Sequence, residues 1–331
     1  MRAAWYEHNG AAADVLVVGE LPDPEPGIGQ VRVRVETAGI NPADVKRRSG
    51  VGGRVMTAPR VIPGDDGAGV IDRIGHDVPA ERLGQRVWVH SATHAKPSGT
   101  AAEFVVVLST QAIKLPTHTS FEVGACLGVP ALTAHRCLFA DGPIDGLTVL
   151  VTGGAGAVGH YAIELARHGG ATVIATASTA EKQLAARNAG ADHVVDYRNS
   201  DAADVIMERA SSGSVDRIID VAFGANLALT SRVIATNGTI ASYSSDAVPE
   251  PTLPFYALMR RNVTIRTVLV FAMPPAAIRD AVGDVTALLV AGRLSHPIAA
   301  RYPLDAIANA HAQVEAPETI GKVLVTGIAD R

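Results

Sequence analysis

The run VLVTGGAGAVGHYAIELA carries the clearest chemical pattern in the sequence. Gly154, Gly156 and Gly159 satisfy GxGxxG between an apolar run and an amphipathic one. In a dinucleotide site the first glycine makes a tight turn, the second lets the backbone approach the pyrophosphate, and the third packs helix on strand. The N–H groups and positive dipole end of the following helix favour the phosphates. The pattern predicts a dinucleotide-binding loop rather than a structural turn.

The nucleotide type depends on the end of the next strand, where an NAD site normally carries an acidic residue. Residues 171–180 contain none. An acid there would repel a 2′-phosphate, whereas Ser178 can donate a hydrogen bond and Lys182 can supply charge. Tyr197 and Arg198 follow the third strand on the same rim. Lys182 and Arg198 could instead be solvated surface charges, but the combination favours NADPH.

Two adjacent carboxylates, Asp65 and Asp66, stand in the stretch PGDDGAG and could hold a metal, move a proton or shape a turn. His90 and His94 have a spacing that would suit a metal on a helix. The Pro and Gly residues that follow indicate a loop with solvated histidines instead.

Cys126 and Cys137 are the only cysteines, which is too few for a disulfide scaffold or a four-thiolate zinc site. They lie in an apolar stretch that is predicted to be helical. We expect both to be buried and reduced.

The elements that must position these residues fall into an α/β arrangement of two domains. Alternating runs in residues 1 to about 120 predict a mostly antiparallel β domain: 30–37, 86–89 and 103–107. From about 122 to 265, strands alternate with helices, which predicts a parallel sheet with right-handed crossovers. The strands are expected at 147–153, 171–177, 193–197, 215–222, 238–243 and 263–270, and the helices at 157–169, 179–190, 201–211 and 225–236.

The C-terminal part predicts helices at 276–291 and 305–314 and a closing strand KVLVTG at 322–327. That strand has the character of the first region and is expected to complete it. We therefore place one domain at 1–121 with 266–331 and the other at 122–265.

Composition limits the possible partners. The chain has 331 residues, 47% of them hydrophobic, and a net charge of −4 without a basic block, which argues against nucleic acid. MRAAWYEHNG lacks the apolar core of a signal peptide, and no run approaches the ~20 apolar residues of a membrane span. We expect a cytoplasmic protein that binds small molecules and no membrane.

The sequence resembles the zinc-independent medium-chain dehydrogenases/reductases of the quinone oxidoreductase, or ζ-crystallin, type. The resemblance is carried by the glycine motif, by DYR and by four further stretches: AGINPADVKRRSG (38–50), PGDDGAGVI (63–71), GVPALTAHRCL (128–138) and TIGKVLV (319–325). It implies a GroES-like β-barrel catalytic domain from both termini and a central Rossmann domain. It also implies a cofactor in the cleft between them and a homodimer joined through Rossmann edge strands.

The resemblance further implies a set of NADPH contacts. Asn41 and Thr133 would lie near the nicotinamide. Lys322, in the matching closing stretch TIGKVLV, is a further expected cofactor contact. The loop from Gly154 to Gly159, with Ala157 and Val158, would hold the pyrophosphate. The 2′-phosphate would be surrounded by Ser178, Lys182 and Tyr197.

Zinc-dependent relatives place a cysteine where Asn41 stands, a His-Glu pair where Asp65 and Asp66 stand, and a second cysteine near Val129. One or two carboxylates alone would bind zinc poorly, so no metal is expected. PGDDGAG is then expected to shape a bend into a strand, with Asp65 near the cleft and Asp66 in a supporting polar network.

A site without a metal suits an electron-poor acceptor such as a quinone or an α,β-unsaturated ketone. The candidate catalytic side chains are Asn41, Lys46 and Asp65, with Asn41 first as a hydrogen-bond donor to the developing oxyanion. Lys46 replaces a tyrosine often found there in the family, and either stabilises an anion or faces solvent. The hypothesis is NADPH-dependent quinone reduction; the alternatives are an alkenal, enone or enoyl-thioester double-bond reductase and a non-catalytic NADPH-binding protein.

Overall fold

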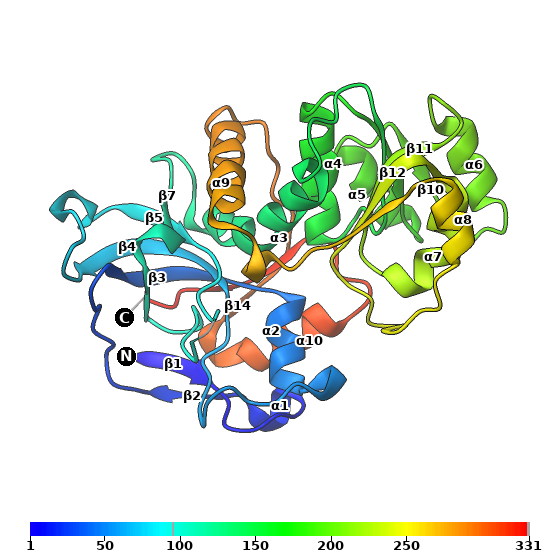
Figure 1. Cartoon of the computed structure of the whole chain (residues 1–331). Helices are drawn as coiled ribbons and strands as arrows, with labels where there is room; N and C mark the ends of the chain where they lie inside the picture. The colour runs from blue at the N-terminus through cyan, green and yellow to red at the C-terminus, as the bar shows by residue number, and fades with distance from the viewer. Residues whose placement is uncertain (95, 330–331) are drawn as a thin grey trace. The chain divides into compact units, whose positions relative to one another are not determined.

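The chain divides into two compact units in a computed structural model that describes residues 1–94 and 96–329. The first unit combines Met1–Val129 with the segment from His296 onward, and the second runs from Pro130 to Ser295 (Figure 1).

The first unit is built mainly from antiparallel strands, as the alternating runs predicted. Its strands are β1 (Arg2–Trp5), β2 (Val17–Glu20), β3 (Gln30–Ile40), β4 (Asp66–Ile74), β5 (Arg86–Val89), β6 (Phe104–Leu108), β7 (Ala112–Lys114), β14 (Ile298–Pro303) and β15 (Lys322–Thr326). β1 pairs with β2, and the others form one sheet in the order β14-β15-β3-β4-β5-β7, with β6 also on β3. Its helices are α1 (Ala12–Val15), α2 (Pro42–Ser49) and α10 (Ile307–Glu315).

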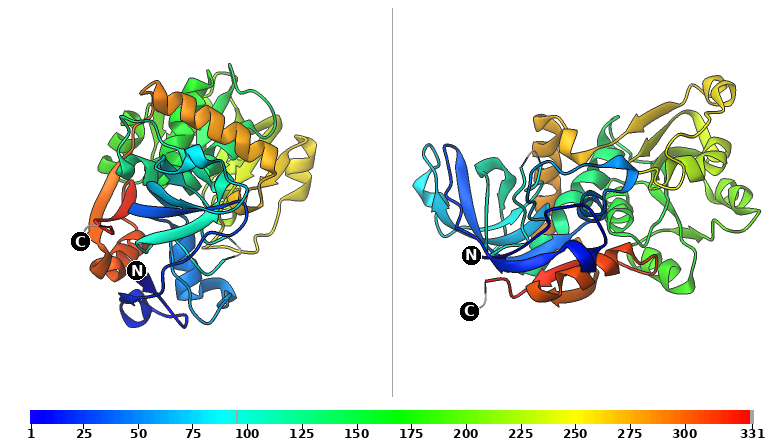
Figure 2. Two further views of the ribbon diagram at one scale, coloured as in Figure 1. Left: turned by 90° about the vertical axis from the view of Figure 1, so that its left-hand side faces the viewer. Right: turned by 90° about the horizontal axis from the view of Figure 1, so that it is seen from below.

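The closing strand β15 completes this unit, which confirms the expectation from KVLVTG. β15 runs antiparallel to β3, with Val323 opposite Ile40 and Thr326 opposite Thr37. Both views in Figure 2 show the red C-terminal strand beside the blue N-terminal strands. The pairing brings Lys322, the first residue of β15, to the end of β3 that precedes Asn41.

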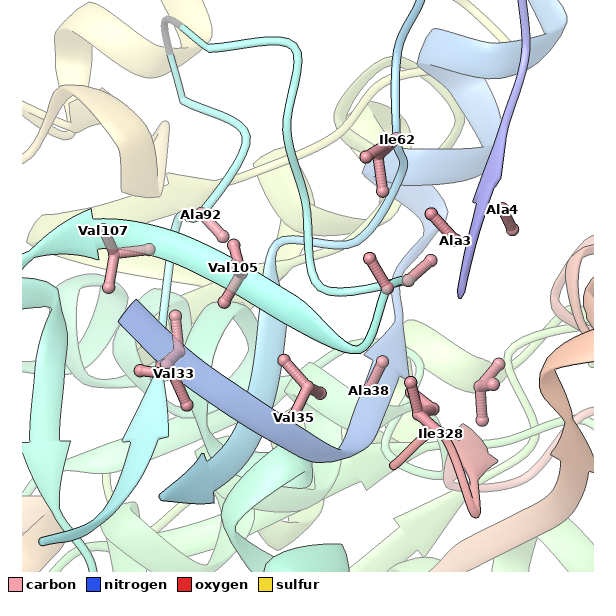
Figure 3. Packing of buried hydrophobic residues seen from close by; sticks show 14 of the residues in the cluster. Ala3, Ala4, Val33, Val35, Ala38, Ile62, Ala92, Val105, Val107 and Ile328 are labelled. Carbon is pink, nitrogen blue, oxygen red and sulfur yellow. The ribbon is translucent and has the colours of Figure 1, made fainter. Parts of the chain in front are cut away.

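The inward side chains of β3 and β6 form part of the core of the first unit. Val33 and Val35 of β3 pack with Val105 and Val107 of β6, and all four are at most 1% exposed (Figure 3). In β6 the buried positions alternate with less buried ones, which is the period-2 pattern that predicted the strand. The packed sheet provides a rigid base for α2 and for the start of β4.

The second unit is a parallel sheet with helical crossovers, also as predicted. Its strands are β8 (Thr148–Val151), β9 (Thr172–Thr176), β10 (His193–Val195), β11 (Val215–Asp220), β12 (Ile234–Ser242) and β13 (Thr264–Thr267). The order is β10-β9-β8-β11-β12-β13, and every pair is parallel. Its helices are α4 (Ala157–His168), α5 (Ala180–Asn188), α6 (Ala202–Arg209), α7 (Phe223–Val233), α8 (Phe255–Arg260) and α9 (Pro275–Val290).

The strand order reverses between β8 and β11. β8 is followed by β9 on one side, and the later strands add on the other side. Ligands of such sheets bind at the carboxyl ends of the strands near this reversal. The described fold therefore places the glycine loop, which follows β8, at the expected position for a nucleotide.

The second unit extends further along the chain than the sequence indicated. It ends at Ser295 rather than at residue 265, so α9 belongs to it. The backbone N–H of Val268 donates to Ser242 O (2.8 Å), and His135 Nε2 contacts Asp284 Oδ2 on α9 (2.8 Å). A helix pattern alone does not indicate the surface on which the helix packs.

Helix α3 (Phe121–Phe139) crosses from one unit to the other and breaks at Gly128 (φ −21°, ψ −105°). Cys126 and Cys137 lie in this helix, and both are free and buried, as predicted. Burial raises the pKa of each thiol to about 12. They are core residues.

Among the residues that the structure describes, none of the helices has the length and apolar character needed to cross a bilayer.

Candidate functional site

The glycine loop joins β8 to α4 at the carboxyl edge of the parallel sheet. Gly156 is the N-cap of α4 and is exposed, and its N–H donates to Gly153 O (3.0 Å). A Cβ added at Gly156 would meet only Gly153 O, at 3.4 Å. Helix N–H groups of the first turn have no intrahelical acceptor, so Ala157, Val158 and Gly159 can offer theirs to an anion. This open cradle fits a pyrophosphate.

The structure corrects the role predicted for Gly154. The tight turn is made by Gly153, which has φ +65°, so the first motif glycine does not make it. A Cβ on Gly154 would instead lie 2.9 Å from Ala175 Cβ on β9, which makes this position a packing site. A Cβ on Gly159 would lie 2.3 Å from Gly153 O, so the predicted close packing at the third glycine is confirmed.

The predicted 2′-phosphate residues gather at the ends of β9 and β10. Ser178 follows β9, Lys182 lies in the first turn of α5, and Tyr197 follows β10 with 47% exposure. The two strands are neighbours in the sheet. Arg198 joins their ends, because its Nη2 donates to Ser178 O as well as to Asp196.

A polar network that sequence reasoning missed lies at the strand reversal. Thr152 Oγ1, just after β8, donates to Asp220 Oδ1 at the end of β11 (2.8 Å). Asp220 Oδ1 also accepts from Asn226 Nδ2 (2.7 Å), while its buried Oδ2 finds no partner among the described residues. The only sequence feature that points to this network is the aspartate that ends the apolar run VDRIID. Nothing in the sequence pairs that aspartate with Thr152.

Sequence reasoning also missed a cavity of about 610 Å³ in the second unit. It lies beyond the carboxyl ends of β12 and β13, and its lining includes Arg136, Phe223, Tyr243, Ser245, Leu269 and Met273. Most of these residues are in loops, whose patterns do not indicate a shared pocket. The cavity and the predicted 2′-phosphate residues lie on opposite sides of the strand reversal between β8 and β11. A dinucleotide that binds across this reversal would place its other half in the cavity.

In the first unit, Asp66 is the centre of a closed network. Its carboxylate is fully buried; Oδ1 accepts from the backbone N–H of Val129 (2.9 Å), and Oδ2 accepts from Asn41 Nδ2 and Lys322 Nζ (both 2.8 Å). Lys322 Nζ also donates to Asn41 Oδ1 (2.5 Å). Burial raises the pKa of Asp66, and the Lys322 ammonium opposes that rise. The predicted polar network around Asp66 is present.

The helix break at Gly128 is required by this network. A Cβ on Gly128 would lie 2.0 Å from Asp66 Oδ1. Glycine at this position therefore lets the chain of α3 approach the carboxylate and present the N–H of Val129 to it.

Asp65 belongs to a second buried cluster. Its Oδ1 accepts from Thr93 Oγ1 (2.5 Å), and its Oδ2 pairs with Arg47, which also binds Asp44 Oδ1 (2.8 Å). Burial, followed by the charge of Asp44, raises the pKa of Asp65 to about 7. The side chain is 0% exposed, so Asp65 supports α2 and the loop at Thr93 from within the first unit.

The donor set at this position does not fit a metal. The Lys322 ammonium already lies against Asp66 and Asn41, so the positive charge that these groups contact is a side chain of the protein itself. Within residues 1–94 and 96–329, no group of three or more His, Cys, Asp and Glu residues is arranged to bind a metal ion. His90 and His94 lie outside any helix, as predicted, and His94 is exposed.

The prediction that His90 is solvated is wrong, because it is 4% exposed. Burial lowers the pKa of His90 to about 4. The side chain lies at the end of β5 beside Trp88, with ring centroids 5.8 Å apart. A loop position therefore did not imply a solvated side chain.

The remaining candidates lie as follows. Lys46 is half-buried on α2, and Thr133 is 4% exposed on the part of α3 that belongs to the second unit. Asn41 is the N-cap of α2, and its backbone N–H donates to Asp44 Oδ2 (2.9 Å). Asn41 and Thr133 belong to different units, so their predicted meeting at the nicotinamide stays a prediction.

Two family models match the chain: the alcohol dehydrogenase GroES-like domain over residues 27–117 and the zinc-binding dehydrogenase over residues 157–286. A quinone oxidoreductase of Lama guanicoe is 30% identical over 312 residues, which cover 94% of this chain and 92% of that protein. The chain belongs to the medium-chain dehydrogenase/reductase family of the quinone oxidoreductase type.

Solved structures of this family share the fold over nearly the whole chain. An NAD-dependent alcohol dehydrogenase, 28% identical, superposes with a TM-score of 0.88 and covers 98% of this chain and 99% of its own. A mycobacterial protein in complex with NADPH, also 28% identical, has a TM-score of 0.86 with the same coverage. Membership makes this protein an oxidoreductase that uses a nicotinamide cofactor.

Family membership also explains the two units. The first corresponds to the GroES-like domain and the second to the Rossmann-like parallel sheet. The family contains zinc-binding members, as the name of the second model says, but in this chain Asn41, Asp66 and Lys322 form the network described above.

Proposed function

We propose that this protein is an NADPH-dependent oxidoreductase that transfers a hydride to a quinone without a metal. The observation that carries the proposal is the Asn41–Asp66–Lys322 network. It places a lysine ammonium against the carboxylate and amide that stand at ligand positions of the zinc-dependent relatives. An acceptor that needs no Lewis acid is then the better substrate, because a quinone spreads the developing charge over a conjugated ring.

When bound, NADPH supplies the hydride. The chain's contribution is to hold it: the glycine loop and the start of α4 receive the pyrophosphate, and Ser178, Lys182 and Tyr197 surround the 2′-phosphate. We place the nicotinamide half in the cavity beyond β12 and β13. The open cradle at Gly156 supports this arrangement.

Of the three side chains predicted to act in catalysis, we keep Asn41 and Lys46 as catalytic candidates and assign Asp65 a positioning role. Asn41 has committed its amide oxygen and one N–H, which leaves a second N–H for an acceptor oxygen. Asp65 is bound by Thr93 and Arg47 and is better understood as a positioning residue for α2. Lys46 remains the cationic candidate for stabilising a reduced acceptor.

We also propose a homodimer formed through the edge of the parallel sheet. β13 pairs only on one side among the described strands, and the adjoining surface exposes Phe255, Tyr256, Met259 and Leu269 by 52–67%. An unpaired edge with exposed apolar side chains favours pairing with a second copy. Light scattering should give the dimer mass, and Phe255→Lys with Met259→Lys should give the monomer. The proposed cytoplasmic location is consistent with the need for NADPH.

Steady-state NADPH oxidation with matched panels of quinones and enones tests the function. We expect turnover of several quinones and weaker activity on enones. Activity on enones alone would identify a double-bond reductase. NADPH binding without turnover of any acceptor would identify a non-catalytic binding protein.

A further inference from the structure

The rim at the ends of β9 and β10 contains an ion pair that the sequence did not indicate. Arg198 Nε donates to Asp196 Oδ1 (2.9 Å), and Arg198 Nη2 donates to Asp196 Oδ2 (2.6 Å). The same Nη2 donates to Ser178 O, and the backbone N–H of Arg198 donates to Asp196 Oδ1 (3.0 Å). One guanidinium therefore neutralises a carboxylate and ties two loops together.

Asp196 is expected to carry its negative charge at neutral pH. Its hydrogen bonds with Arg198 lower its pKa to about 2. An acid is thus present at this rim after all, one strand later than the position where NAD sites normally carry it. A free carboxylate there would repel a 2′-phosphate, whereas it could accept hydrogen bonds from ribose hydroxyls.

A second carboxylate, Glu181, lies in the first turn of α5. It is held by its own backbone N–H and by Thr179, which lower its pKa. The positive charges of Lys182 and Arg198 therefore balance the negative charges of Glu181 and Asp196. Loss of Arg198 would leave the rim with a net negative charge.

We propose that Arg198 is a specificity-determining residue that favours NADPH over NADH by neutralising Asp196. It acts through Asp196 and through the position of Ser178, and its own guanidinium is already engaged. The inference rests on the proposed NADPH function and adds a residue and a charge balance to it. When Arg198 is removed, the Asp196 carboxylate is able to accept hydrogen bonds from the ribose hydroxyls of NADH.

Arg167 offers a matched control. It is about as exposed as Arg198, lies 3.8 Å from Asp192 and donates to Gly190 O (3.0 Å). It lies in the last turn of α4 and pairs with Asp192, the residue before β10, so it is at the amino end of β10, opposite to the nucleotide rim. Arg167→Ala removes the same charge from the same unit without changing the nucleotide rim.

The test measures binding of NADPH and NADH to the full chain by titration, for the wild type, Arg198→Ala, Arg167→Ala, Asp196→Asn and the double variant of 196 and 198. Arg198→Ala should weaken NADPH binding by about fivefold and change NADH binding by less than about twofold, since one exposed charge is involved. Asp196→Asn should keep or improve NADPH binding. The double variant should recover most of the loss, and Arg167→Ala should match the wild type.

Failure of the proposed cofactor and failure of the inference about Arg198 give different results. A wild type that binds NADH at least as tightly as NADPH overturns the proposed cofactor and this inference together. A wild type that prefers NADPH, with Arg198→Ala equal to Arg167→Ala, overturns only the inference. Equal loss of both cofactors, or a double variant no better than Arg198→Ala, would show that Arg198 only holds the loops; equal melting temperatures of the variants exclude misfolding as the cause.

Discussion

Replacement of Lys322 by methionine tests the buried network in the first unit. The ammonium is 3% exposed and lies 2.8 Å from Asp66 Oδ2, and the carboxylate is 0% exposed. Without the ammonium, Asp66 keeps hydrogen bonds from Asn41 and Val129 but loses its ion-pair partner among the described residues. Breaking a buried pair in this way costs about 3–5 kcal/mol. That is a large fraction of the roughly 5–15 kcal/mol that stabilises a domain.

The loss should depend on pH with a definite sign. The pKa of Asp66 is already raised by burial, and removal of the ammonium raises it further. A carboxyl group with a raised pKa in the folded state loses stability as pH rises, because the unfolded chain ionises first. Lys322→Met should therefore be more destabilised at high pH and recover part of the loss as the pH falls toward the ordinary pKa of an aspartate.

Urea unfolding followed by tryptophan fluorescence provides the assay. Trp5 and Trp88 are the two tryptophans, and both belong to the first unit, so their signal reports on the unit that carries the change. Lys114→Met, on the exposed end of β7 in the same sheet, should stay within about 0.5 kcal/mol of the wild type. The double variant Lys322→Met with Asp66→Asn should be less destabilised than Lys322→Met alone.

Two results would refute this reasoning. One is a Lys322→Met protein within about 1 kcal/mol of the wild type at pH 8, which would mean that the carboxylate needs no counter-charge. The other is a double variant as unstable as the sum of its single changes, because residues that share a contact are expected to couple.

Three further predictions concern the loop, the buried histidines and Lys46. Gly159→Val would bring a side chain against Gly153 O and force the loop to shift, so it should abolish NADPH binding in a titration; retained binding contradicts the proposed loop. Burial lowers the pKa of His90 and His311 to about 4, so the free energy of unfolding should rise with pH from about 4 to 6.5. His311→Phe should reduce the slope of this rise by about one proton. An unchanged slope would show that His311 is charged in the folded state. Lys46→Met should lower kcat for quinones by about tenfold or more with NADPH affinity unchanged, whereas an unchanged kcat would place Lys46 in solvent.

Periodic patterns predicted the regular elements well. RVWV is β5 from Arg86 to Val89, and the alternation of strand and helix after residue 147 gave the six parallel strands in the right chain order. These elements obey local rules, because burial on one face follows a period of 2 in strands and 3.6 in helices. The GxGxxG loop was placed correctly for the same reason.

Contacts between segments that are distant in the sequence were harder to predict. Lys322 meets Asp66 across 256 positions, and no local pattern relates a lysine at the start of one strand to an aspartate at the start of another. The turn role of Gly153 and the pairing of Arg198 with Asp196 depend on exact backbone geometry. The domain end near 265 was placed too early because the packing of α9 is decided by side chains such as Asp284.

The central claim, hydride transfer from NADPH to a quinone without a metal, is tested most directly by a single-turnover experiment. The full chain is dialysed against a chelator, loaded with NADPH deuterated at the transferred position of C4, and mixed with a quinone while cofactor fluorescence is recorded. We expect full loss of the NADPH signal, one hydroquinone per cofactor and a primary isotope effect on the rate. Absence of NADPH oxidation with every quinone, or activity that appears only after zinc is restored, would contradict it.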